Sequence, residues 1–274
     1  MDYAGLITAL TPAVDAAGKV ILDIKASGPA SKSKIDGSPV TLADQEAEKI
    51  LLAALADVCP EIPVVSEENT DSHSLPIGPQ FFLVDPLDGT KEFLKTDHDG
   101  AFTINIGLIE QGLPVMGMVY APARRALYWG YKDGGAFLRE GRRITPIKVR
   151  EVPDSGAIAV TSASHLDSAT THWLSQHQIG KTTSIGSSLK FVLVASGQAD
   201  VYPRFGPTME WDTAAGDAIL RAAGGIMCHP NGQVYSYGKP TTETRLLLPM
   251  GNLLVNHTAA HLPPQSHAFE LSVS

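Results

Sequence analysis

Two stretches near the N-terminus repeat hydrophobic residues with the period of an α-helix. Between residues 3 and 24 an apolar side chain recurs every third or fourth position, which predicts a helix with one buried face. Residues 42–58 repeat the pattern directly after Thr41. This second helix is expected to end near Cys59-Pro60, because proline cannot donate the next backbone hydrogen bond. The apolar face of the first helix consists of Leu6, Leu10, Val14, Ala17, Ile21 and Ile24.

The segment between the two predicted helices has the composition of a loop. Residues 27–39 are rich in serine, glycine, lysine and proline, which interrupt regular structure. We therefore predict a mobile loop here, with Lys32 and Lys34 available to contact an anion.

From residue 62 onward the pattern changes to short apolar runs of the kind that form β-strands. Gln111-Gly112 has the residues of a tight turn and predicts a hairpin between the two runs that flank it. Residues 140–156 are looser, and we place there the boundary between an N-terminal subdomain, 1–150, and a C-terminal subdomain, 151–274. Strands are expected within 62–69, 80–86, 101–110, 113–122 and 126–140.

Beyond this boundary, predicted strands and helices mix without strict alternation. The mixture favours a layered α+β fold over a doubly wound parallel sheet. The tail, residues 261–274, carries no clear element and is expected to fray. Strands are expected at 156–163 and 199–205, and helices at 171–179, 188–197 and 210–225.

The composition is that of an ordinary globular enzyme. Hydrophobic residues make up 43% and charged residues 18% of the 274 positions. The formal net charge of -8 argues against broad nucleic-acid binding, which needs a basic face. A small anionic ligand stays compatible with this charge, because a local site can oppose the global sign.

The N-terminus lacks the basic patch and continuous apolar core of a signal peptide, and no apolar run approaches the length of a membrane span. We therefore expect a cytoplasmic protein with no integral membrane segment. Cys59 and Cys228 are expected to be buried thiols outside any disulfide. The histidines at 98, 172 and 177 have no metal-ligand context and are expected at the surface.

Acidic residues gather where predicted strands end. Asp85 and Asp88 flank Pro86, which sets a turn that lets the two carboxylates converge. Gly89 permits a close backbone approach, and Thr90 is the predicted N-cap of a short helix. The free amides at such a helix start suit a phosphate group.

Two further acidic positions are expected to join this turn, the pair Glu67-Glu68 and Asp212. Clustered carboxylates repel one another unless a cation lies between them, and hard oxygen ligands without cysteine indicate Mg²⁺. Taken alone, each motif has a simpler interpretation: a solvated loop, a charged strand end, or an acid that complements a helix dipole. Their joint placement at the ends of elements favours a metal site.

Together these motifs resemble those of the inositol monophosphatase superfamily, which contains Mg²⁺-dependent, lithium-sensitive phosphatases. The stretches VSEEN, DPLDGTKEF and EWDTAAGDA occur in the order typical of that superfamily, and the likeness runs from about residue 5 to residue 250. The resemblance implies a layered α/β/α/β/α sandwich of the inositol monophosphatase and fructose-1,6-bisphosphatase type. The bacterial CysQ-type branch, the 3'(2'),5'-bisphosphate nucleotidases, is the closer match, because inositol phosphatases usually have Thr-Asn-Phe where this chain has Lys-Glu-Phe.

By this resemblance, Glu67, Asp85 and the Leu87 carbonyl would bind a first Mg²⁺ ion. Asp85, Asp88 and Asp212 would bind a second, and a third, weaker ion would share Glu67. The implied chemistry is in-line attack of water on phosphorus with no covalent intermediate. Displacement of one ion by lithium is expected from the same resemblance.

The resemblance also implies roles for residues around the metals. Asp44 would accept a hydrogen bond from Thr90 and so orient the attacking water, although from the residues alone Asp44 passes as a helix N-terminal acid. Gly89 and Thr90 would offer amides and a hydroxyl to the phosphate. The implied catalytic residues are Asp44, Glu67 and Thr90.

Several residues shortly before Asp212 are candidates for substrate specificity. Arg204 has the fork to clamp a second phosphate, and Tyr202 or Phe205 can line a wall for the base. The alternative places Lys190 on a solvated helix face and Tyr202 in the core. The full predicted substrate-binding set is Glu67, Leu87, Asp88, Gly89, Thr90, Lys190, Tyr202, Arg204 and Asp212.

The leading hypothesis is an enzyme that removes the 3'-phosphate of adenosine 3',5'-bisphosphate to give AMP in sulfur assimilation, with 3'-phosphoadenosine 5'-phosphosulfate as a further candidate substrate. The alternatives are an inositol or sugar phosphate phosphatase of the same fold and a non-catalytic nucleotide-binding regulator. Motifs of P-loop kinases, dinucleotide-binding proteins and serine hydrolases are absent from the sequence. Whether the protein is a monomer or a homodimer, and whether it associates peripherally with the inner membrane, stays open.

Overall fold

The computed structural model describes residues 1–28, 31–33, 39–95, 100–163, 167–239 and 247–251. Its centre is a seven-stranded sheet with the order β3-β4-β5-β6-β7-β8-β9. Neighbouring strands are antiparallel except β3 and β4, which are parallel. The strands are β3 Val64–Ser66, β4 Gln80–Asp88, β5 Thr103–Glu110, β6 Leu113–Ala121, β7 Ala126–Tyr131, β8 Gly135–Glu140 and β9 Arg143–Ile147.

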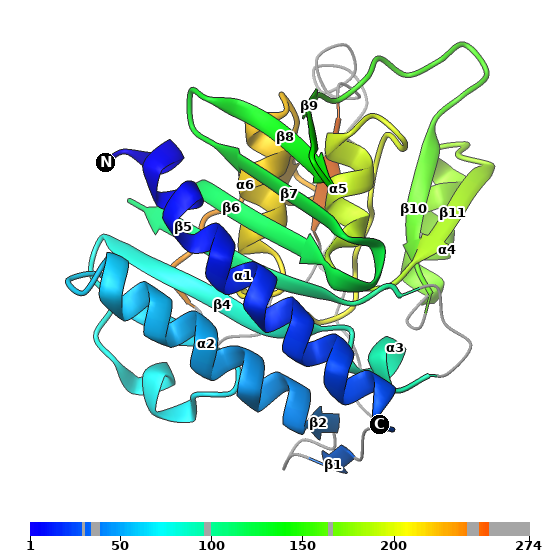
Figure 1. The fold of residues 1–274 in the computed structure, drawn as a ribbon. Coiled ribbons are helices and arrows are strands. Elements are labelled where there is room, and N and C mark those ends of the chain that lie inside the picture. The colour runs from blue at the N-terminus through cyan, green and yellow to red at the C-terminus, as the bar shows by residue number, and fades with distance from the viewer. Residues whose placement is uncertain (29–30, 34–38, 96–99, 164–166, 240–246, 252–274) are drawn as a thin grey trace, which may run out of the picture.

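One face of this sheet is covered by α1, Tyr3–Ala26, and α2, Leu42–Val58 (Figure 1). Both helices lie where the apolar periodicity predicts them, and α2 starts at the predicted cap. There, Thr41 accepts from the Ala43 N–H, and the Asp44 carboxylate accepts from the Thr41 N–H in a capping box. The buried faces of α1 and α2 pack with one face of the sheet in a single hydrophobic cluster.

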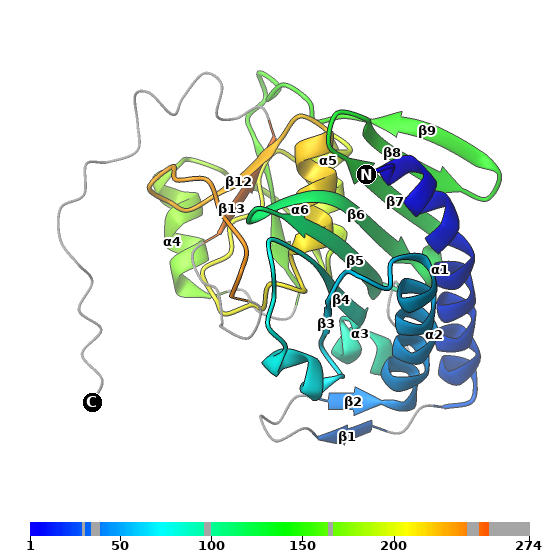
Figure 2. The ribbon, with the colours of Figure 1, turned by 90° about the vertical axis from the view of Figure 1, so that its left-hand side faces the viewer.

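The opposite face is covered by α5, Leu189–Ala195, and α6, Ala214–Ala222. Behind these two helices lie two strand pairs, and α4, Ser168–Gln176, is outermost (Figure 2). The order of layers is therefore helix, sheet, helix, sheet, helix, which confirms the predicted α/β/α/β/α sandwich. The outer pairs are β10 Ile158–Ser162 with β11 Lys181–Ile185, parallel, and β12 Ile226–Cys228 with β13 Leu248–Met250, antiparallel.

Three predictions about local structure were wrong. Residues 143–147, expected to be loose, form β9 at the edge of the large sheet, because Arg143 to Ile147 pair with β8. The predicted strand at 199–205 makes only isolated bridges, of which Val201 joins Ala159 to Met250. Within the loop predicted at 27–39, β1 Ser31–Ser33 pairs with β2 Pro39–Thr41, and Lys34 lies outside the described residues.

Other predictions hold. The turn at Gln111-Gly112 joins β5 to β6 with positive φ at both residues, as a two-residue hairpin requires. His172 on α4 and His177, which caps the end of α4, are both exposed, whereas His98 and the tail at 261–274 lie outside the described residues. The division of the chain near residue 150 stays a prediction.

The first helix is long and apolar enough, by length and composition alone, to cross a membrane. Its packing shows a different role. Leu10, Val14 and Ile21 are buried in the cluster shared with α2 and the sheet. Removing α1 from this position would expose that face, so the helix is a core element of the sandwich.

Candidate active site

Three carboxylates from separate segments converge beside the carboxyl-terminal end of β4. Oxygen atoms of Glu67, Asp85 and Asp212 all lie within 4.8 Å of one another. Glu67 directly follows β3, and its N–H donates to the Val84 carbonyl at 3.1 Å, which sets it beside Asp85. Asp212 arrives from the other side, in the turn that precedes α6. All three are metal ligands predicted from the sequence, and the fold brings them together.

The end of β4 is shaped by its own hydrogen bonds. The Asp85 carboxylate accepts from the Leu87 N–H at 2.9 Å, and the register with β5 shifts between Asp85 and Asp88. Gly89 then takes a φ of 90°, where a Cβ would lie 3.0 Å from the Ala101 carbonyl oxygen. The helix α3, Thr90–Leu94, therefore begins after Gly89 as its N-cap. The prediction that Thr90 is the cap was wrong.

Asp88 lies next to the three acids and has partners of its own. Its carboxylate accepts from the Ser188 hydroxyl at 2.9 Å, and the same hydroxyl lies 2.8 Å from the Asp212 carbonyl oxygen. Burial and the charge of Asp212 raise the pKa of Asp88 to about 6, while Lys190 and Ser188 oppose the rise. Asp88 thus faces both the acids and a cation. Ser188 was not among the site residues predicted from the sequence.

The side chains that form this cluster are all acidic, so their negative charges are not balanced within the cluster. Asp85 is 1% exposed, and burial, followed by the charges of Glu67, Asp88 and Asp212, raises its pKa well above the ordinary value. Such a set is stabilised by a cation that coordinates several oxygens at once. The donors are all carboxylates, which are the ligands of hard metal ions, and the cluster is able to hold a metal.

Two segments brace Glu67 from outside. The Glu48 carboxylate on α2 accepts from the Glu68 N–H at 3.2 Å. The Ser66 N–H donates to the Ser72 hydroxyl at 3.0 Å, and the His73 ring lies 2.9 Å from the Ser66 carbonyl oxygen. These contacts hold the residues on both sides of Glu67 in one conformation.

The turn that carries Asp212 is held by its own side chains. The Asp212 carboxylate accepts from the Thr208 hydroxyl at 2.7 Å and from the Met209 N–H at 2.9 Å. The buried Glu210 carboxylate accepts from the N–H groups of Gly238 and Lys239, each at 3.1 Å. The turn is therefore tied to a segment more than 20 residues later in the chain.

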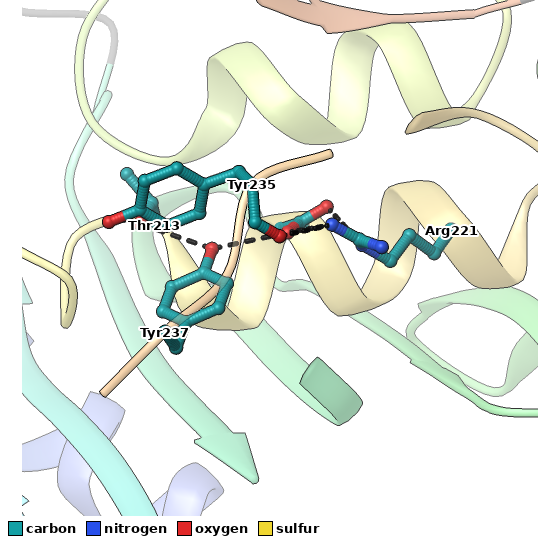
Figure 3. Close-up of polar contacts among 5 residues, drawn as sticks. Thr213, Arg221, Tyr235 and Tyr237 are labelled. Atoms are coloured by element: carbon teal, nitrogen blue, oxygen red, sulfur yellow. Dashed lines mark hydrogen bonds and ion pairs between the residues drawn. The ribbon is translucent and has the colours of Figure 1, made fainter. Parts of the chain in front are cut away.

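A polar network behind this turn continues the link into α6 (Figure 3). The Tyr237 hydroxyl lies 3.3 Å from both the Thr213 hydroxyl and the Asp217 carboxylate. Asp217 is paired with Arg221, whose guanidinium also donates to the Tyr235 carbonyl oxygen at 3.1 Å. Thr213 lines the pocket described below, so the network reaches the site from the protein interior.

Asp44 and Thr90 meet as the resemblance implies. The Thr90 hydroxyl lies 3.3 Å from one Asp44 oxygen and 3.2 Å from the Leu87 carbonyl oxygen. The other Asp44 oxygen accepts from the N–H and hydroxyl of Thr41 at 2.8 and 2.6 Å. Asp44 thus combines the structural role of a capping acid with a direct link to Thr90.

A pocket of about 260 Å³ opens beside the acids. Lys190 and Tyr202 line it although they are only 5% and 2% exposed. The alternative that places Lys190 on a solvated helix face is therefore wrong, since its ammonium donates to the Ser187 carbonyl and lies 5.4 Å from the centre of the Tyr202 ring. Tyr202 both packs against Phe191 and faces the pocket.

Arg204 lines the same pocket with its guanidinium held in place. One terminal nitrogen donates to the Tyr202 hydroxyl at 3.1 Å and the other to the Pro207 carbonyl at 2.5 Å. Its buried Nε has no hydrogen-bond partner within the described residues. The pocket thus combines carboxylates with two cationic side chains. The full set of predicted site residues, apart from the buried Asp44, Asp85 and Leu87, lines it.

The comparisons with known proteins agree with this architecture. The model of the inositol monophosphatase family matches residues 2–268. The chain belongs to the inositol monophosphatase family.

The individual proteins compared below are all CysQ proteins. The chain is 48% identical over 205 residues to the 3'(2'),5'-bisphosphate nucleotidase CysQ of Salmonella typhimurium, which is 74% of this chain and 81% of that protein. The CysQ protein of Escherichia coli K12 is 47% identical over 193 residues, 70% of this chain and 76% of that one. The crystal structure of CysQ from Bacteroides thetaiotaomicron has a TM-score of 0.76 at 34% identity, covering 91% of this chain and 98% of that one.

Proposed function

We propose that this protein is a metal-dependent 3'(2'),5'-bisphosphate nucleotidase. It removes the 3'-phosphate of adenosine 3',5'-bisphosphate to give AMP and phosphate, and it serves sulfur assimilation in the cytoplasm. The observation that carries the proposal is the pocket that joins the acid set to Lys190 and Arg204, because one substrate with two phosphates needs both halves. The 48% identity to a protein of that name supports the same substrate. 3'-Phosphoadenosine 5'-phosphosulfate carries the same 3'-phosphate and is proposed as a second substrate.

The proposed metal is Mg²⁺, since every donor in the set is an oxygen. Glu67, Asp85 and the Leu87 carbonyl would hold one ion, and Asp85, Asp88 and Asp212 a second, with Glu67 available to a weaker third. When bound, Mg²⁺ supplies Lewis acidity, which makes water a better nucleophile and stabilises charge on the leaving oxygen.

The protein's own residues orient the attack. Thr90 donates to Asp44, so its oxygen lone pairs are left to accept a hydrogen bond from water at the mouth of the acid set. Asp44 is fixed by Thr41 and cannot turn away. The proton of the water therefore has a path toward Thr90 and Asp44. Gly89, with its positive φ, leaves the backbone open to close approach by the phosphate.

The remaining phosphate is held on the cationic side of the pocket. Lys190 is buried and Arg204 is partly buried, and both are anchored by carbonyl groups, which reduces the entropy lost when an anion binds. Tyr202 and Phe191 provide aromatic surface for the adenine. An inositol monophosphate has neither a second phosphate for the cations nor a base for this surface.

The test is phosphate release from adenosine 3',5'-bisphosphate and from inositol 1-phosphate, side by side with Mg²⁺ and again with EDTA. We expect fast release from the nucleotide only, and none in EDTA. Preference for the inositol ester would be consistent with the proposed metal chemistry but would refute adenosine 3',5'-bisphosphate as the substrate. Release from neither ester would favour a nucleotide-binding regulator.

A further inference from the structure

A row of polar side chains crosses three neighbouring strands at the acid set. Glu67 lies beside Asp85, and Asp85 is directly opposite Asn105 on β5. Opposed residues of an antiparallel pair point to the same face, with their Cβ atoms about 4.5–5.5 Å apart. Asn105 therefore continues the row as its neutral member.

The face of β5 that carries Asn105 looks toward the start of α6. At Gly107, the next residue on this face, a Cβ would lie only 2.7 Å from the Ala214 Cβ. Ile106 points the other way, into the cluster formed with α1 and α2. The Asn105 side chain is therefore enclosed between the sheet and the segment that follows Asp212.

Asn105 is buried without an evident protein partner. Its side chain is 0% exposed, and neither Nδ2 nor Oδ1 has a hydrogen-bond partner anywhere in the described ranges of the chain. The hydroxyl of Thr103, opposite Asp88 beyond the register shift, is equally buried and equally without a partner there. Buried polar groups are nearly always satisfied, and a structural role for Asn105 in the metal-free protein would require a partner. These atoms therefore need a partner that the described residues do not supply, such as water or a ligand.

We propose that Asn105 is a positioning residue of the metal site, an inference that rests on the proposed function. Its Oδ1 accepts from, and its Nδ2 donates to, water that fills the site around the bound cation, and this holds the water in register with Asp85. Mg²⁺ suits such an arrangement because it keeps several waters when it binds to protein. Partners of this kind typically account for about 10–100-fold of metal affinity. The Thr103 hydroxyl joins them from the side of Asp88.

The test separates this role from an ordinary structural one. Asn105→Leu keeps the branching at Cγ and removes both polar atoms. Replacing an unsatisfied buried group by an apolar one of similar shape is neutral or stabilising. We therefore expect the melting temperature of the variant in EDTA to equal or exceed that of the wild type. With Mg²⁺ alone, calorimetric titration should show affinity about 10–100-fold weaker, and the thermal shift produced by Mg²⁺ should shrink accordingly.

Thr161→Val is the matched control. Thr161 is also buried, but its hydroxyl donates to the Thr183 carbonyl at 3.3 Å, away from the acid set. This variant should lose stability in EDTA and keep its Mg²⁺ affinity. The two variants thus have opposite signatures.

Two results would overturn the proposal for Asn105: a clear fall in melting temperature in EDTA, or unchanged Mg²⁺ affinity. If Asn105→Leu does not yield folded protein, Asn105→Ala removes the same atoms without adding volume, and its Mg²⁺ affinity decides in the same way. Failure of the wild type itself to bind Mg²⁺ would instead refute the proposed metal site.

Discussion

Replacing Thr90 by valine tests the proposed path of the proton with little change in shape. The substitution exchanges one hydroxyl for a methyl group at the start of α3. The lost contacts are those to Asp44 at 3.3 Å and to the Leu87 carbonyl at 3.2 Å. The carboxylates of the metal site are untouched, so a loss of activity would belong to the hydroxyl.

The structure sets the expected magnitudes. Asp44 keeps the two hydrogen bonds from Thr41, so the free energy of unfolding should fall by only about 0.5–1.5 kcal/mol, the contribution of one hydrogen bond. Proton handling by a positioned side chain contributes about 10²–10⁴-fold to a rate. At about 1.36 kcal/mol for each factor of ten, the barrier should rise by about 2.7–5.4 kcal/mol. The expected rise in the activation barrier is therefore larger than the expected fall in the free energy of unfolding.

The assay is the initial rate of phosphate release from adenosine 3',5'-bisphosphate at saturating Mg²⁺, with kcat and KM fitted separately. We expect kcat to fall while KM changes little. Urea unfolding measures the free energy of unfolding of the variant. Thr90→Ser retains the hydroxyl and should recover most of the rate. If Thr90→Val kept kcat within threefold of the wild type, the role assigned to the Thr90–Asp44 pair would be refuted.

Four further predictions address the rest of the site. Asp85→Asn should lower kcat by at least 10³-fold, because it removes a charge shared by two proposed metal ions, and a phosphate-release assay in excess Mg²⁺ checks this. Arg204→Ala should reduce kcat/KM about 10–100-fold for adenosine 3',5'-bisphosphate, from the loss of charged hydrogen bonds of about 1.5–3 kcal/mol, and less for a simple monoester assayed in parallel. Tyr237→Phe should lower the free energy of unfolding in urea by about 1–3 kcal/mol, since it leaves part of the buried Asp217 carboxylate unsatisfied. Millimolar lithium should inhibit phosphate release more strongly than equimolar sodium, and equal effects would contradict the family behaviour.

The helices, the hairpin and the acid set could be predicted because each has a local signal. The caps and the apolar periodicity of α1 and α2 depend on residues within or next to each helix. The turn at Gln111-Gly112 is likewise determined by its own two residues. The acids at Glu67, Asp85 and Asp212 fall at the ends of elements, where the fold brings them together. The resemblance of three motifs in order supported the same grouping.

The rest depends on contacts that the sequence does not display. The burial of Lys190 beside Tyr202 follows from the packing of α5, and a short amphipathic stretch cannot reveal it. The edge strand β9 is held by its pairing with β8, despite the proline and charges that make 143–147 look like a loop. From the sequence, Asn105 is an ordinary strand residue. Only the register between β4 and β5 shows that it lies opposite Asp85.

The most direct test of the central claim is anomalous diffraction from crystals grown with Mn²⁺ and AMP, since Mn²⁺ accepts the same oxygen ligands as Mg²⁺. We expect an anomalous peak bounded by the carboxylates of Glu67, Asp85 and Asp212, with the nucleotide beside Lys190 and Arg204. A fully occupied nucleotide with no metal among these three carboxylates would contradict it.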